Sequence, residues 1–309
     1  MKHIVAGLMA AALLGGCGGG GSSNPFDGRG EDDDTTTPPP AGSSVPAEIA
    51  QDVTGVAFDP VTQTLTVEGL SFDGTTDPVT YNRAAALDVP GYQAYTIQQD
   101  GASRHSTAFA AQSQTSGAVT AGVAATGGPR NRFFTGAFFE RTGSYTQPTS
   151  GEVVYTGRYV GITNLDSQGG DLLSPPAGLA PELIPTQAAS TQGDVVLRAN
   201  FGDRQIEGNI INRRLSETPG GVVIDLPSLV LINAEITEGG TFSGTVEYDQ
   251  SAFPADRVTG TSIGSSAGVF GGTGATEVAG GIKLNEFDGP GNPLGLNNEL
   301  ETGIFVLDR

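Results

Sequence analysis

The sequence has few of the residues that staple folds, bind metals or perform catalysis. Its 309 residues include one cysteine, no tryptophan and two histidines, one of which is His3. A lone cysteine cannot form an internal disulfide. With a single histidine beyond the N-terminus, a zinc site would depend on carboxylates, which is unusual. We therefore expect no disulfide staple, no metal site and no cofactor.

The second histidine gives little support for catalysis. His105 stands between Arg104 and Ser106, and a lone histidine in such a place is more often solvated than catalytic. No Gly-x-Ser-x-Gly nucleophile elbow is present. Carboxylates are plentiful, so composition alone leaves a paired-carboxylate hydrolase open, although no neighbouring feature argues for one. We predict that the protein is not an enzyme.

Positive charge is also scarce. Lysine and arginine number 15 against 34 aspartates and glutamates, which gives a formal net charge of −19. Such an acidic surface repels nucleic acid and anionic lipid alike, so no nucleic-acid partner is expected. It keeps a protein soluble and could attract cationic partners, but acidity alone names no partner.

The short apolar run at the N-terminus predicts secretion. Lys2 precedes the apolar run 4–14, and Gly15-Gly16-Cys17 follows, which is typical of a signal peptide over residues 1–16. The run is too short for a permanent transmembrane helix. Its ending resembles the bacterial lipobox, which implies acylation of Cys17 with fatty acids such as palmitate and, because Gly18 follows, sorting to the outer membrane. The alternative is a plain signal peptide beside an unpaired cysteine.

Residues 17–48 are expected to be a lipidated, disordered tether. Glycine and serine after Cys17 give flexibility, and the proline run 38–40 extends the chain. Nothing in this segment can bury a core. Asp32-Asp33-Asp34 could bind a cation, but a charge run without alternating ligands is usually solvated.

Beyond the tether the pattern is all-β. No window has a convincing helical stripe; the best, 82–87, is short and uncapped. We expect a smaller β-rich N-terminal domain over 49–148. Its expected strands are 53–58, 64–70, 92–98, 105–111, 118–125 and 133–140.

The alternation is clearer in residues 149–309, where eight strands are expected. Their segments are 152–162, 195–201, 205–212, 230–236, 242–248, 265–271, 277–284 and 303–308. Most neighbours are joined by short turns, which indicates antiparallel pairing. Eight such strands can close into an up-and-down barrel whose interior is filled by side chains.

The glycine-rich stretch 268–281, GVFGGTGATEVAGG, can be tested against a phosphate-binding loop. Such a loop needs a strand, glycines and then a helix. Gly280 and Gly281 stand where that helix would continue, no Gly-Lys-Ser/Thr follows, and the third glycine of a dinucleotide fingerprint is absent. A β-hairpin is therefore predicted, with the turn at 271–274.

The same stretch resembles the hairpin signature of transferrin-binding protein B-like barrels. The matching residues are Gly268, Phe270, Gly271, Ala275, Glu277 and Gly280. Segments 153–159, 194–208, 241–244 and 303–309 fit the same template in order, so the resemblance covers about residues 150–309. It implies a surface lipoprotein of a Gram-negative bacterium, with relatives that bind haemoglobin or complement factor H. The shared residues are structural in the family and select no ligand.

A cluster of aromatic and cationic residues is the remaining candidate for ligand contact. Phe133, Phe134, Phe138 and Arg141 lie in its densest part, and such residues dominate interface hot spots. The alternative, which we favour, is a strand buried on both faces where the two halves meet.

Together these features predict an outer-membrane lipoprotein, anchored by lipid and exposed at the cell surface. By resemblance it would bind a protein or a metal- or haem-bearing nutrient and deliver it to an outer-membrane transporter. The alternative is a structural or envelope-associated lipoprotein with no nutrient role. Function inferred through a fold is analogy.

Overall fold

The structure is a computed structural model that describes residues 45–70, 77–128, 132–149, 151–216, 221–252 and 260–309. All of them fall within one compact unit, residues 37–309. The signal peptide, Cys17 and most of the expected tether lie outside the described residues. Among the residues described, no helix is long and apolar enough to cross a membrane.

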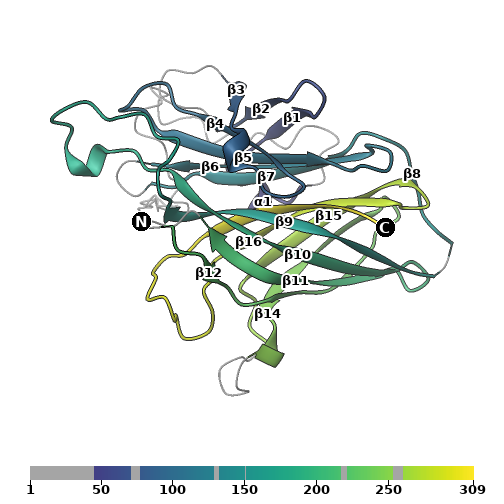
Figure 1. The fold of residues 1–309 in the computed structure, drawn as a ribbon. Coiled ribbons are helices and arrows are strands. Elements are labelled where there is room, and N and C mark those ends of the chain that lie inside the picture. The colour runs from purple at the N-terminus through teal and green to yellow at the C-terminus, as the bar shows by residue number, and fades with distance from the viewer. Residues whose placement is uncertain (1–44, 71–76, 129–131, 150, 217–220, 253–259) are drawn as a thin grey trace, which may run out of the picture. The chain divides into compact units, whose positions relative to one another are not determined.

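The N-terminal part is a seven-stranded antiparallel sheet in which each strand pairs with the next along the chain (Figure 1). The strands are β1 (Gly55–Asp59), β2 (Thr64–Glu68), β3 (Val79–Arg83), β4 (Gln93–Ile97), β5 (His105–Gln112), β6 (Val119–Gly127) and β7 (Thr135–Arg141). The segment just before β1 lies beside β7, where the Asp52 N–H donates to the Thr135 carbonyl (3.1 Å). The short helix α1 (Ala47–Ala50) precedes it.

The C-terminal part is a closed eight-stranded antiparallel barrel, as the sequence predicts. Its strands are β9 (Glu152–Asp166), β10 (Ala188–Asn200), β11 (Gln205–Ser216), β13 (Leu229–Glu235), β14 (Thr241–Tyr248), β15 (Gly264–Thr273), β16 (Glu277–Leu284) and β17 (Glu301–Asp308). Pairing of β17 with β9 closes the ring. Two short strands are added: β8 (Tyr145–Thr146) pairs with β15, and β12 (Ile224–Asp225) pairs with β11.

The barrel interior is filled by side chains. Phe270 is fully buried, and its ring lies 5.3–5.6 Å from those of Tyr155, Phe201 and Phe242. Such spacings are typical of favourable aromatic pairs. Glycine makes room for a further ring, since a Cβ at Gly280 would lie 2.3 Å from the Phe305 ring. The predicted hairpin glycine therefore serves packing inside the barrel.

One wall of the barrel is buried on its outer face as well. Strands β9, β16 and β17 contact β6, and β15 to β17 contact β7. Their outward side chains, among them Val160, Val269, Ala279 and Ile304, join the hydrophobic core of the N-terminal sheet. Strand β6 is buried at every position, because its alanines and glycines let the barrel wall approach one face and β1 of the same sheet the other.

The expected organisation needs two corrections in the N-terminal half. Val45 is buried and α1 begins at Ala47, so ordered chain starts before residue 49. Strand β3 is not among the predicted strands, because it has only five residues and its last two lie in the weak helical candidate 82–87. The weak helical candidate 82–87 divides into the end of β3 and a 3₁₀ turn, 85–87.

Candidate functional site: the long-loop end of the barrel

The connections of the barrel differ sharply between its two ends. Connections 167–187, 217–228, 249–263 and 285–300 are long and follow β9, β11, β14 and β16. Since the strands alternate in direction, all four emerge at one end, here named the long-loop end. The turns 201–204, 236–240 and 274–276 emerge at the opposite, tight-turn end. Binding residues concentrate on loops that a rigid scaffold positions.

Exposed aliphatic side chains gather on the long loops. Of seven large hydrophobic residues that are exposed in the described chain, five lie on these connections: Leu173, Ile184, Val222, Val223 and Leu294. Val222 and Val223 are 57% and 58% exposed. Exposed apolar residues concentrated on the loops of one end favour an interaction site there.

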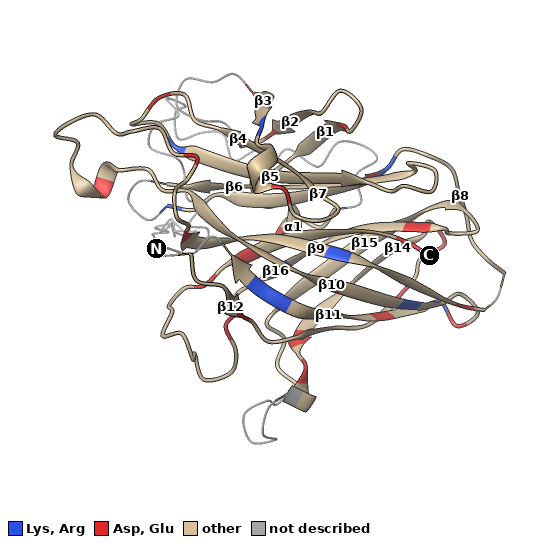
Figure 2. Ribbon diagram, in the orientation of Figure 1, with Lys and Arg blue, Asp and Glu red and all other residues tan. Residues whose placement is uncertain are grey.

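The long-loop end is also acidic. Its described residues include Asp171, Glu182, Asp225, Asp249, Glu286, Asp288 and Glu299, and contain no lysine or arginine. Figure 2 shows arginines on the strands of the barrel wall instead, on β9, β10 and β11. A ligand that docks on these loops therefore meets apolar side chains within a field of negative charge.

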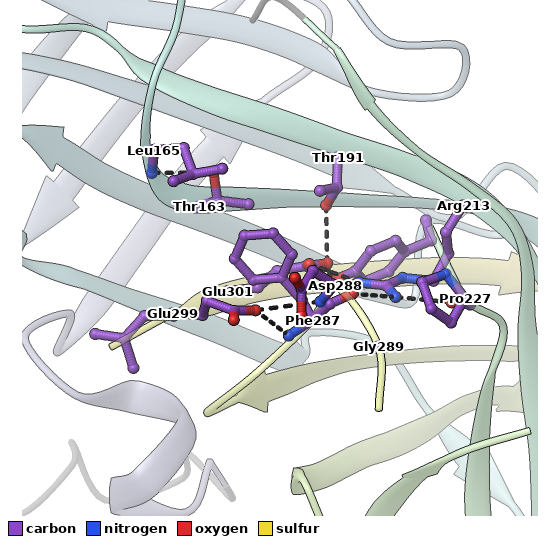
Figure 3. Close-up of polar contacts among 12 residues, drawn as sticks. Thr163, Leu165, Thr191, Arg213, Pro227, Phe287, Asp288, Gly289, Glu299 and Glu301 are labelled. Atoms are coloured by element: carbon purple, nitrogen blue, oxygen red, sulfur yellow. Dashed lines mark hydrogen bonds and ion pairs between the residues drawn. The ribbon is translucent and has the colours of Figure 1, made fainter. Parts of the chain in front are cut away.

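Loop 285–300 is held at its base by buried groups (Figure 3). A carboxylate oxygen of Glu299 accepts the N–H groups of Phe287 (2.9 Å) and Asp288 (3.2 Å). Phe287 is fully buried, and the Gly289 N–H donates to the Tyr248 hydroxyl (3.1 Å). Burial raises the pKa of Glu299 although the two N–H donors oppose it. The exposed tip of the loop, with Leu294, thus rests on a fixed base.

A buried ion pair lies inside the barrel next to this base. Arg213 and Glu301 are both fully buried, and Arg213 Nη2 donates to Glu301 Oε2 (2.6 Å). Glu301 Oε1 accepts the hydroxyls of Tyr159 (2.6 Å) and Thr191 (2.8 Å). Arg213 Nη1 donates to the Pro227 carbonyl (2.8 Å). Burial raises the pKa of Tyr159 well above its ordinary value, so the hydroxyl stays a donor.

A β-bulge directs Arg213 into the barrel. The register between β10 and β11 shifts between Gln192 and Asp194, opposite Asn212, which has φ 53°. Before the bulge Ile206 and Ile210 face the interior; after it Arg213 does, while Arg214 is exposed. Bulges re-aim side chains in this way. Because its side chains have no exposure, the Arg213–Glu301 pair organises the barrel and offers no surface for a substrate.

Comparison with protein-family models gives a match over residues 147–293 to the C-lobe and N-lobe β-barrels of Tf-binding protein B. Over these residues the barrel is Tf-binding protein B-like. Among curated protein sequences none matches the chain.

Similar solved structures are also Tf-binding protein B (TbpB) structures. They include intact Ap-TbpB with its N and C lobes (TM-score 0.42, 13% identity), a double mutant of Haemophilus parasuis Hp5 TbpB (0.41, 15%) and isotype 1 TbpB of serogroup B Neisseria meningitidis (0.37, 16%). The matches cover 79%, 78% and 79% of this chain and 41%, 42% and 41% of those chains. This chain therefore spans about two fifths of their length.

The glycine-rich stretch of the TbpB-type barrel forms an antiparallel hairpin of β15 and β16, with Gly271 opposite Glu277. Gly268 and Phe270 lie in β15 and Gly280 in β16, while Ala275 is in the turn and has φ 52°. A strand follows the glycines, not the helix that a phosphate loop requires. Tyr155 donates its hydroxyl to the Ala275 carbonyl, which fixes this turn to the barrel interior.

Glu277 of this hairpin holds the N-terminal sheet. Its carboxylate is fully buried and accepts the Ser113 hydroxyl (2.5 Å), the Ala118 N–H (2.8 Å) and the Ser116 N–H. The loop between β5 and β6 supplies all three donors. Asp308 of β17 accepts two further N–H groups of the same loop, those of residues 114 and 115. Sequence reasoning identified Glu277 but not its partner loop, which no local pattern reveals.

The aromatic and cationic cluster is spread along β7. Phe133 and Phe134 are partly buried before the strand begins, at the side of the long loops. Phe138 is 7% exposed and belongs to the core. Arg141, at the far end, donates to the carbonyls of Gly239 and Phe270 (2.9 Å each), at the tight-turn end. Strand β7 is thus largely buried on both faces, and its burial accounts for Phe138.

We predict that Glu277→Gln lowers the free energy of unfolding by about 1–3 kcal/mol, because one of the two accepting oxygens becomes an N–H₂ group that faces a buried donor. Denaturant unfolding measures the change. Glu207→Gln, on the exposed outer face of β11, is the matched control and should change stability by less than about 0.5 kcal/mol. Equal stability of the two variants would show that the Glu277 contacts do not hold the sheets together.

Proposed function

We propose that the chain is an outer-membrane-anchored lipoprotein that binds a ligand at its long-loop end without performing chemistry on it. The ligand class is a protein or a metal- or haem-bearing nutrient, which the protein would pass to an outer-membrane transporter. Support comes from the family that the barrel matches, whose name refers to transferrin binding, and from the lipobox-like ending at Cys17.

The long-loop end is the observation that carries this proposal. Four long connections leave the rigid barrel side by side, and they bear most of the exposed aliphatic side chains of the described chain. The opposite end has tight turns closed by hydrogen bonds. A scaffold with one elaborated end suits recognition of a partner.

The ionisable groups support binding over catalysis. The ring of His105 is buried and its Nε2 lies 3.2 Å from Asp171. Arg213 and Glu301 are buried and bonded to each other. His105, Arg213 and Glu301 are thus buried side chains bonded within the protein, whereas an enzyme needs reactive groups that face a cleft. Among the described residues no group of three or more histidine, cysteine, aspartate or glutamate side chains is placed to hold a metal ion.

Protease shaving of intact cells tests the placement of the protein. We expect the folded body to be degraded from outside, since a surface receptor must reach extracellular ligands. An antibody to the barrel measures the loss, and a periplasmic protein serves as the control for intact envelopes. Survival until the outer membrane is permeabilised would contradict the receptor and favour a periplasmic structural lipoprotein.

Substitution of the exposed loop residues tests the binding surface. The combined change Val222→Asp, Val223→Asp and Leu294→Asp should weaken ligand binding at least about tenfold, because truncating or charging hot-spot contacts typically costs more than 1–2 kcal/mol. Affinities for a panel that includes transferrin and haemoglobin measure the effect. Val154→Asp, on an exposed position of the barrel wall (48%), is the control. An equal loss in the control variant would contradict the assignment of the long-loop end.

A further inference from the structure

His105 joins the N-terminal sheet to the longest of the barrel loops. It is the first residue of β5, and its side chain is 1% exposed. Its Nε2 lies 3.2 Å from a carboxylate oxygen of Asp171 in connection 167–187. Since an ionised carboxylate only accepts hydrogen bonds, Nε2 carries the proton and donates it. One side-chain bond thus links the N-terminal sheet to a barrel loop at the proposed binding end.

Other contacts press the same loop onto the sheet. The Leu173 N–H donates to Gln98 Oε1 (2.8 Å), just beyond β4. A Cβ at Gly101 would lie 1.9 Å from the Ser174 carbonyl oxygen, so the loop backbone passes directly over the turn between β4 and β5. Leu173, adjacent to these anchors, is 47% exposed. The anchors therefore fix the part of the loop that presents an apolar side chain.

The second ring nitrogen of His105 makes the link sensitive to acid. Nδ1 is buried and has no hydrogen-bond partner among the described residues. Because Nε2 already carries a proton, further protonation must occur at Nδ1. A charged N–H would then be buried without an acceptor, which is strongly unfavourable. Water can solvate that proton only when the loop moves away.

The charged neighbours of the ring do not remove this penalty. The Asp171 carboxylate contacts Nε2 of the ring and not Nδ1, where the second proton would bind. Arg104 holds its guanidinium 4.7 Å from the Phe134 ring, and Asp100 accepts the N–H groups of Ala102 and Ser103. Glu182 is exposed in the same loop, and β6, which pairs with β5, has no titratable side chain. On the other side of β5, strand β4 carries Tyr95, whose hydroxyl donates to Gln93 Oε1 (2.7 Å). Burial lowers the pKa of His105 from its ordinary 6.5, although Asp171 opposes the shift.

We propose that His105 and Asp171 form an acid-sensitive clasp that positions loop 167–187 at the binding end and releases it when the pH falls. The role of the loop in binding rests on the proposed function; the clasp itself does not. When the loop is released, His105 is exposed to water, and it then binds a proton more tightly than it does in the clasped state. Acidification from above the ordinary pKa to below the clasped-state pKa therefore shifts the equilibrium toward release, by about tenfold for each unit of difference between the two pKa values.

Amide hydrogen exchange of the full chain tests the clasp without any ligand. After correction for the intrinsic pH dependence of exchange, protection of residues 167–187 should fall roughly tenfold per unit of pKa difference between pH 7.5 and pH 5.0. Protection of the hairpin 264–284 should stay unchanged, which confirms that the fold is intact. A constant protection of the loop in the unsubstituted protein would overturn the proposal.

His105→Gln is the matched variant. The glutamine amide can still donate to Asp171 but does not titrate, so loop protection should be the same at both pH values. If this variant loses protection at pH 5.0 as the unsubstituted protein does, another group is responsible and the proposal is wrong. Because the measurement contains no ligand, neither outcome depends on whether the long-loop end binds one.

Discussion

The arrangement of the protein depends on one wall of the barrel being buried on both of its faces. Strands β15, β16, β17 and β9 pack inward against aromatic side chains and outward against β6 and β7. Small residues make this possible: a Cβ at Gly281 would already lie 3.0 Å from Ile49. Buried apolar area on two faces is a strong stabilising contribution. It also fixes the N-terminal sheet beside the long loops.

Polar contacts then determine how the two sheets align. Glu277 and Asp308 receive the loop between β5 and β6 at the tight-turn end. In the middle of the wall the Tyr92 hydroxyl donates to the Arg158 carbonyl (2.7 Å) and accepts the Val306 N–H (3.1 Å), which bridges β9 and β17. Directional bonds of this kind select one alignment among those that apolar packing alone would allow. The His105–Asp171 bond lies at the long-loop end. Water reaches this bond, because the Asp171 side chain is 41% exposed.

The sequence alone predicts all eight strands of the barrel, but it predicts less of the candidate site. Alternation marks β10, β11, β13 and β14, whereas β15, β16 and β17 are buried on both faces, and the glycine-rich hairpin signature identifies β15 and β16 instead. The N-terminal sheet is buried on both faces in β5 and β6, which removes alternation, and β3 was missed. The inward position of Arg213 could not be predicted from the sequence, since the alternation of Ile206 and Ile210 would direct Asn212 inward. Only the bulge places Arg213 there. The cluster from Phe133 to Arg141 is close in sequence but extends from one end of the barrel to the other along β7.

The central claim is that both sheets form one rigid body that presents the long loops. The chain has no tryptophan, so a single introduced tryptophan reports on one sheet. Phe58→Trp would report on the N-terminal sheet and Phe201→Trp on the barrel interior. Denaturant unfolding should give the same midpoint with both reporters, as expected of one cooperative unit. Two different midpoints would contradict the account if backbone circular dichroism also shows two transitions at the same two denaturant concentrations. That result would show that the sheets unfold independently.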